Sequence, residues 1–210
     1  MRRLLIITLT FLCNFAQADI AGEFDYYVLA LSWTPNWCAR EGDARGSAQC
    51  DPDQGFGWTL HGLWPQYERG YPQDCAAPAS LDPTRQQSAL MADIMGSGGL
   101  AFYQWRKHGR CSGLSGSAYY AASRAAYEAV TRPPVLRQLP RALKIPASVV
   151  EEAFLQSNPD LAPDMLTITC RDGYIQEARL CLTKELARRR CGSDVIRDCS
   201  AKDAVMTPIR

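Results

Sequence analysis

The chain of 210 residues contains two histidines, and each is followed by a glycine. His61 lies in residues 57–65 (GWTLHGLWP), and His108 lies in residues 102–111 (FYQWRKHGRC). A pair of imidazoles can supply an acid and a base near neutral pH. Lys107, next to His108, can stabilise a developing negative charge. A histidine taken alone is as often an ordinary core or surface residue, but this combination suits cleavage of a phosphodiester whose own 2′-hydroxyl is the nucleophile.

The segment around His108 predicts a helix that presents a polar face. Spacings of three or four residues place six side chains on that face: Leu100, Tyr103, Gln104, Lys107, His108 and Cys111. This face carries an imidazole, an ammonium, an amide and a phenol, so it is not the apolar face by which a helix packs into a core. Because His108 falls in the last helical turn, we expect the helix dipole to favour its protonated form.

Aromatic side chains crowd the two histidine segments. Nucleobases stack on such rings for about 1–3 kcal/mol each. Trp64, beside His61, is the stacking candidate, whereas Trp58 and Trp105 are expected in the core. The predicted substrate-binding residues are Trp64, Gln66, Tyr71 and Tyr103.

Other kinds of site fit the sequence less well. No Cys-x-x-Cys pair is present and no histidine has ligand spacing to a cysteine pair, so neither a metal nor another cofactor is expected. The segment 113–117 (GLSGS) misses the last glycine of the Gly-x-Ser-x-Gly pattern of serine hydrolases. Basic and acidic residues number 23 and 22, which argues against a protein that binds polyanions mainly by overall charge.

The first eighteen residues are interpreted as a secretory signal peptide. Arg2 and Arg3 precede a mostly apolar stretch at 4–15 that is too short to span a bilayer, and 16–18 (AQA) is a small-x-small cleavage site. A membrane anchor is the alternative. Removal of this segment, with Cys13, leaves eight cysteines: Cys38, Cys50, Cys75, Cys111, Cys170, Cys181, Cys191 and Cys199. In an exported chain they predict four disulfides, whose pairing the spacing leaves open. The lack of Asn-x-Ser/Thr sites favours a bacterial periplasmic or secreted protein.

Residues 19–210 are expected to form one α+β domain around an antiparallel sheet. With 47% hydrophobic residues, the chain is neither a disordered tail nor a fibre. Strands are predicted at 24–33 and at 56–63, the latter stopped by Pro65, and a hairpin joins 166–170 to 174–183 through Asp172-Gly173. Helices are predicted at 84–95, 100–108, 117–130 and 146–155, and residues 38–53 are expected to be a loop pinned by cysteines.

The pattern His61-Gly62-Leu63-Trp64-Pro65 together with Trp105-x-Lys107-His108-Gly109-x-Cys111 closely resembles the ribonuclease T2 family, and residues 27–33 resemble its first core strand. The resemblance implies a metal-independent endoribonuclease that cleaves single-stranded RNA by transphosphorylation through a 2′,3′-cyclic phosphate. His108 would be the base, His61 the acid, and Lys107 the group that stabilises the phosphorane.

The resemblance also implies structural properties. It implies helices on one side of the antiparallel sheet. Independently of the resemblance, no other segment approaches eighteen apolar residues, so no membrane contact is expected, and we expect a monomer without an obligate protein partner. The implied disulfides are Cys38–Cys50, Cys75–Cys111, Cys170–Cys199 and Cys181–Cys191.

Two residues depart from the family pattern. Gln104 stands where the family usually has glutamate, and Tyr103 stands where histidine is common. Glutamine keeps the hydrogen bonding but lacks the charge, so the departure bears on rate and pH dependence more than on the type of reaction. The rival interpretations are an inactive relative that only binds RNA and a disulfide-rich binding module.

Overall fold

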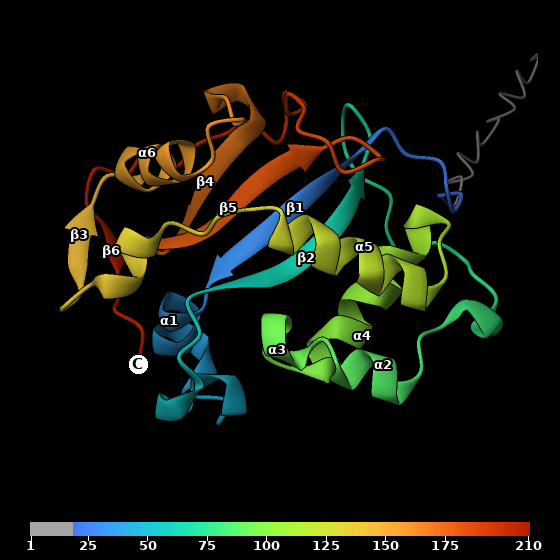
Figure 1. The fold of residues 1–210 in the computed structure, drawn as a ribbon, viewed down its shortest axis with the longest axis horizontal. Coiled ribbons are helices and arrows are strands. Elements are labelled where there is room, and N and C mark those ends of the chain that lie inside the picture. Colours follow the sequence, from blue (N-terminus) through green and yellow to red (C-terminus); the bar gives the residue numbers. More distant parts are fainter. Residues whose placement is uncertain (1–18) are drawn as a thin grey trace, which may run out of the picture.

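The computed structural model describes residues 19–210, so the expected signal peptide lies outside the described residues. In this range the sheet is built from β1 (Tyr26–Trp33), β2 (Trp58–Gln66), β3 (Leu143–Ile145), β4 (Leu166–Arg171), β5 (Tyr174–Leu182) and β6 (Ala204–Met206). Strands β2, β1, β5 and β4 lie side by side and pair antiparallel (Figure 1). Strand β6 meets β5 through one parallel bridge and pairs antiparallel with β3, so the sheet is antiparallel except at that bridge.

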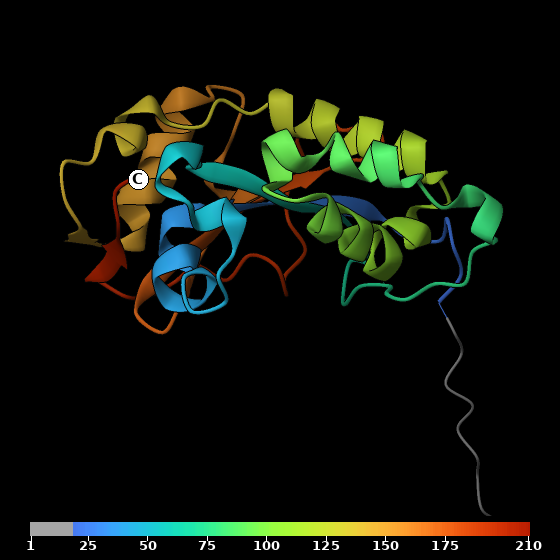
Figure 2. The same ribbon diagram turned by 90° about the horizontal axis from the view of Figure 1, so that it is seen from below.

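The helices are α1 (Thr34–Trp37), α2 (Arg85–Ala89), α3 (Ala92–Met95), α4 (Gly98–Lys107), α5 (Gly116–Glu128) and α6 (Ala147–Ser157). Figure 2 shows α5 and α6 together on one side of the sheet. Helix α4 lies near β2, and its Ala101 and Trp105 join the core. No helix among residues 19–210 is long and apolar enough to cross a membrane. The predicted α+β class is confirmed.

The side chains of β1 alternate between the face of the sheet that packs into the main core and the opposite face. Tyr27, Leu29, Leu31 and Trp33 enter the main core, whereas Tyr26 and Val28 belong to a small cluster with Cys181. Successive side chains of a strand point to opposite faces of the sheet. The main core therefore fills one face, and the face that carries Val28 is left available for polar side chains.

Three predicted elements differ from the structure. Strand β2 continues through Pro65, because β2 ends the strand order of the sheet and proline is tolerated in an edge strand. The expected helix at 84–95 is split into α2 and α3. The expected loop at 38–53 contains three short helical turns, at Cys38–Gly42, Ala48–Cys50 and Pro52–Gln54.

The hairpin and the disulfides are as predicted. Asp172 and Gly173 both have positive φ, at 51° and 80°, as a two-residue turn of this kind requires. The four disulfides are Cys38–Cys50, Cys75–Cys111, Cys170–Cys199 and Cys181–Cys191. Trp58 and Trp105 are buried in the core, also as predicted.

Candidate active site

An irregularity in strand β2 places His61. Ala30 pairs with Gly62 and Leu31 pairs with Leu60, so His61 has no partner residue on β1. A bulge of this kind redirects a side chain and often lies next to a functional site. Leu60 enters the core, and the imidazole of His61 lies on the opposite face of the sheet, where its side chain is 33% exposed.

A buried carboxylate contacts His61. Glu177, on the neighbouring strand β5, is 1% exposed, and its Oε1 lies 2.5 Å from Nδ1 of His61. Its Oε2 accepts a hydrogen bond from Nε of Arg179 at 2.8 Å. Burial raises the pKa of Glu177, but the hydrogen bond and charge of His61, together with the charge of Arg179, outweigh burial and lower this pKa to about 2. Glu177 therefore carries a negative charge.

The sequence interpretation missed Glu177 and Arg179. A signal was present in the predicted strand at 174–183, where both charged residues alternate with the apolar Ala178 and Leu180. Charged side chains repeated at a spacing of two on an inner strand must share one face of the sheet. Nothing in the sequence indicates that this face carries His61, because the two contacting residues are 116 positions apart.

The second histidine follows the last residue of α4. His108 is 7% exposed, and its Nδ1 has no hydrogen-bond partner among residues 19–210. Burial, followed by the charges of Lys107 and His61, lowers the pKa of His108 to about 3. The expectation that the helix dipole favours protonated His108 is therefore wrong. His108 is buried beside a lysine, and its Nδ1 has no hydrogen-bond acceptor. These effects lower its pKa by more than the partial negative charge of the helix end raises it.

Trp64 lies between the two histidines. Its ring centroid is 5.1 Å from that of His61 and 5.3 Å from that of His108. The indole Nε1 donates a hydrogen bond to Oε1 of Gln104 at 2.8 Å. A Cβ at Gly62 would lie 2.3 Å from that indole nitrogen, so this approach requires glycine. Trp64 therefore fixes the spacing of the two imidazoles.

Trp64 and the two histidines line a cleft of about 380 Å³. Every predicted catalytic and substrate-binding residue lines this cleft as well. The predicted lining residues are His61, Trp64, Gln66, Tyr71, Tyr103, Gln104, Lys107 and His108. Tyr71 and Tyr103 are 50% and 54% exposed, whereas Gln66 and Gln104 are buried. The expected helical face is only partly present, because Leu100 lines a different cavity and Cys111 lies in the short turn Gly109–Ser112.

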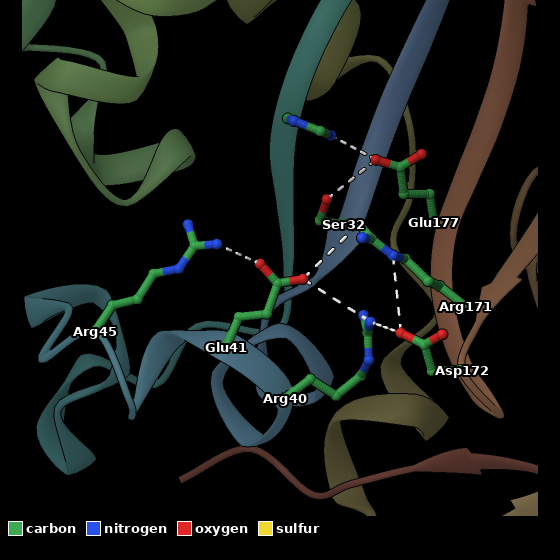
Figure 3. A network of polar contacts seen from close by, with 8 residues as sticks. Ser32, Arg40, Glu41, Arg45, Arg171, Asp172 and Glu177 are labelled. Carbon is green, nitrogen blue, oxygen red and sulfur yellow. Dashed lines mark hydrogen bonds and ion pairs between the residues drawn. The ribbon is translucent and has the colours of Figure 1, made fainter.

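That second cavity, of about 250 Å³, meets the cleft at His61. It contains a network of charges in which Glu41 is paired with Arg40, Arg45 and Arg171 (Figure 3). Arg40 also pairs with Asp172 in the turn of the hairpin. His61 thus has a cavity on either side. Residues 19–210 contain no group of three His, Cys, Asp or Glu side chains that could hold a metal ion.

Restoring a carboxylate at position 104 should raise the pH at which His108 titrates. In Gln104→Glu, the new charge enters the cleft that holds His108, and a nearby carboxylate favours imidazolium. We expect the acid limb of the pH–rate profile for cleavage of a dinucleotide to move to higher pH. Gln104→Met is the uncharged control: it removes the acceptor of the Trp64 N–H and adds no charge, so its acid limb should not move to higher pH. Superimposable profiles for the glutamate variant and wild type would contradict this prediction.

Solved structures share this fold. RNase NT, solved in complex with 5′-AMP, aligns with a TM-score of 0.66 and 20% identity over 90% of this chain and 100% of its own. An RNase-related protein from Calystegia sepium aligns with a TM-score of 0.65 and 18% identity over 89% and 98% of the two chains. At these identities the likeness shows the fold alone, which is that of a class of ribonucleases.

The family follows from the sequence comparison. Residues 24–191 match the Ribonuclease T2 family, and the chain belongs to that family. A ribonuclease of Aeromonas hydrophila is 50% identical over 95 residues, which are 45% of this chain and 41% of that protein. A probable ribonuclease of Haemophilus influenzae is 31% identical over 121 residues, covering 52% and 44%. The chain thus spans less than half the length of these two curated relatives.

Proposed function

We propose that this protein is a metal-independent endoribonuclease that cleaves single-stranded RNA by transphosphorylation, through a 2′,3′-cyclic phosphate. One observation carries the proposal: a single cleft holds two imidazoles in opposite electrostatic surroundings. His61 contacts a buried carboxylate, whereas His108 is buried beside a lysine. Groups whose surroundings differ in this way are suited to act as acid and base in one reaction. Membership in the Ribonuclease T2 family supports the choice of RNA as substrate.

In this reaction His108 is the base. Its lowered pKa keeps the imidazole neutral, so that it can take the proton of the 2′-hydroxyl. The 2′-oxygen then attacks the adjacent phosphorus while the bond to the 5′-oxygen breaks. His61 gives its proton to that leaving oxygen, and Lys107 stabilises the charge of the phosphorane. Hydrolysis of the cyclic phosphate follows, with the two histidines exchanging roles.

The surface of the cleft suits a flexible strand. The half-exposed rings of Tyr71 and Tyr103 are open to stacking with bases. Trp64 is more enclosed, because its ring packs against both histidines and the Arg179 guanidinium lies 5.4 Å from its centroid. We propose that Trp64 holds the edge of a base and that Gln66 forms part of the floor of the cleft. A 2′-hydroxyl must enter the cleft to reach buried His108, which a single strand can do more easily than a duplex.

Several properties of the whole protein belong to the proposal. Four disulfides suit an oxidising compartment, which supports an exported protein, periplasmic or secreted. The lack of Asn-x-Ser/Thr sites supports a bacterial one. Residues 19–210 are proposed to act as one ribonuclease domain and as a monomer. No cofactor takes part in the proposed reaction.

Activity should persist in excess EDTA. Lys107 supplies the positive charge that a metal ion would otherwise provide, and the acid and base are side chains. The measurement is the initial rate of digestion of yeast RNA with and without chelator, with a metal-dependent nuclease in parallel to show that the chelator is effective. Loss of turnover that a divalent ion restores would overturn the mechanism. Binding of RNA without cleavage in either condition would favour the inactive relative.

A further inference from the structure

We propose that Glu177 is a positioning residue for the reaction: its carboxylate fixes the orientation of the His61 ring and so decides which of its nitrogens faces the substrate. The inference rests on the proposed function, because it explains how His61 can serve as the acid. Glu177 itself does not touch the RNA. It acts through the imidazole that it contacts.

The geometry assigns one nitrogen of His61 to each task. Nδ1 lies 2.5 Å from Oε1 of Glu177, so Nδ1–H donates to the carboxylate. Nε2 is then the nitrogen left for the substrate, and it can donate a proton only when the ring is an imidazolium. The same contact therefore sets the orientation of the ring and the nitrogen that meets the leaving oxygen.

The carboxylate is held firmly enough to do this. It is 1% exposed on an inner strand, and both of its oxygens have partners. Oε1 also accepts from Oγ of Ser32 at 3.4 Å (Figure 3). Oε2 accepts from Nε of Arg179 at 2.8 Å. A buried carboxylate is costly unless cations and hydrogen bonds compensate for the lost water. Removing it would leave the guanidinium of Arg179 and the Nδ1–H of His61 without their partner.

Other charges around His61 do not replace Glu177. On α4 and just after it, Lys107 and His108 face His61 across the cleft, and neither side chain carries a carboxylate. In the second cavity, the carboxylate of Glu41 is engaged by three arginines: Arg40, Arg45 and Arg171. On β5, Arg179 offsets part of the charge of Glu177. Within residues 19–210, Glu177 is thus the carboxylate in direct contact with this imidazole.

The test is the tautomer of the neutral His61 ring in Glu177→Leu, read from ¹⁵N shifts at alkaline pH in RNA-free protein. The chain has two histidines, so His61→Asn and His108→Asn variants assign both signals. We expect wild type to carry the proton on Nδ1 and Glu177→Leu to lose that preference. In the same variant kcat should fall at least tenfold while KM stays within threefold, because Glu177 does not touch the RNA. Ser32→Ala is the matched control: it removes a bond to the same oxygen, and both the tautomer and kcat should stay.

A second variant should restore the contact. In Glu177→Gln the amide oxygen can still accept a hydrogen bond from Nδ1–H, so the wild-type tautomer and part of kcat should return. If Glu177→Leu does not fold, this variant and the wild-type ¹⁵N shifts of His61, which must show a protonated Nδ1, decide the role of Glu177. An unchanged tautomer in folded Glu177→Leu, or a neutral wild-type ring protonated on Nε2, would overturn the inference. If wild type cleaves no RNA, the proposed function fails, while the tautomer measurements still decide the role of Glu177.

Discussion

Replacing His108 by alanine should lower the rate of RNA cleavage by a factor of about a hundred or more, and replacing His61 should have an effect of the same order. Without His108, the cleft lacks the buried, neutral imidazole that takes the proton of the 2′-hydroxyl in the proposed reaction. Lys107 is charged and cannot take its place. Without His61, the leaving 5′-oxygen departs without a proton. Neither side chain belongs to the main core, so both variants should keep the fold.

The measurement is the initial rate of cleavage of single-stranded RNA and of a dinucleotide, with thermal unfolding as the test of the fold. Leu90→Ala is the control, because Leu90 is an exposed apolar side chain between α2 and α3. Added imidazole should restore part of the activity of His108→Ala by entering the space that the ring leaves. A folded variant of either histidine that cuts RNA within threefold of the wild-type rate would show that the roles are assigned wrongly.

The candidate catalytic groups could be proposed from the sequence because their information is local. Gln104, Lys107 and His108 lie on one short segment, and Trp64 lies three residues from His61. Helical spacing therefore suffices to place the first three together. That both segments line one cleft depends on α4 lying near β2, which spacing does not reveal. The family resemblance supplied that link, and the structure confirms it.

The parts that could not be predicted depend on strand register and burial. The bulge at His61 follows from how β2 pairs with β1, and Glu177 reaches His61 from a strand more than a hundred positions away. The charge state expected for His108 failed for a related reason. The helix dipole can be read from sequence, whereas the burial that outweighs it comes from the tertiary structure. Pro65 likewise stays in β2 because that strand is at the edge of the sheet.

Removing the disulfide Cys75–Cys111 should reduce both stability and activity. Its cysteines are 36 positions apart, and a bridge of this kind typically contributes about 2–4 kcal/mol to the free energy of unfolding. Cys111 is fully buried three residues after His108, and Cys75 anchors the loop that carries Tyr71. The backbone N–H of Asp74, next to Cys75, donates to the carbonyl of Lys107 at 2.8 Å. The bridge therefore holds that loop against the end of α4, where the cleft is formed.

The matched control is the disulfide Cys170–Cys199, whose cysteines are 29 positions apart and outside the residues that line the cleft. Because the two loops are similar in length, replacing either pair by alanine should cost about the same stability, measured by denaturant unfolding. Cleavage, measured at a temperature where both variants are folded, should separate them. We expect at least a tenfold lower kcat/KM for the Cys75/Cys111 variant and near wild-type activity for the control. Equal activity in the two folded variants would show that the bridge stabilises the chain as a whole and does not position His108 and Lys107.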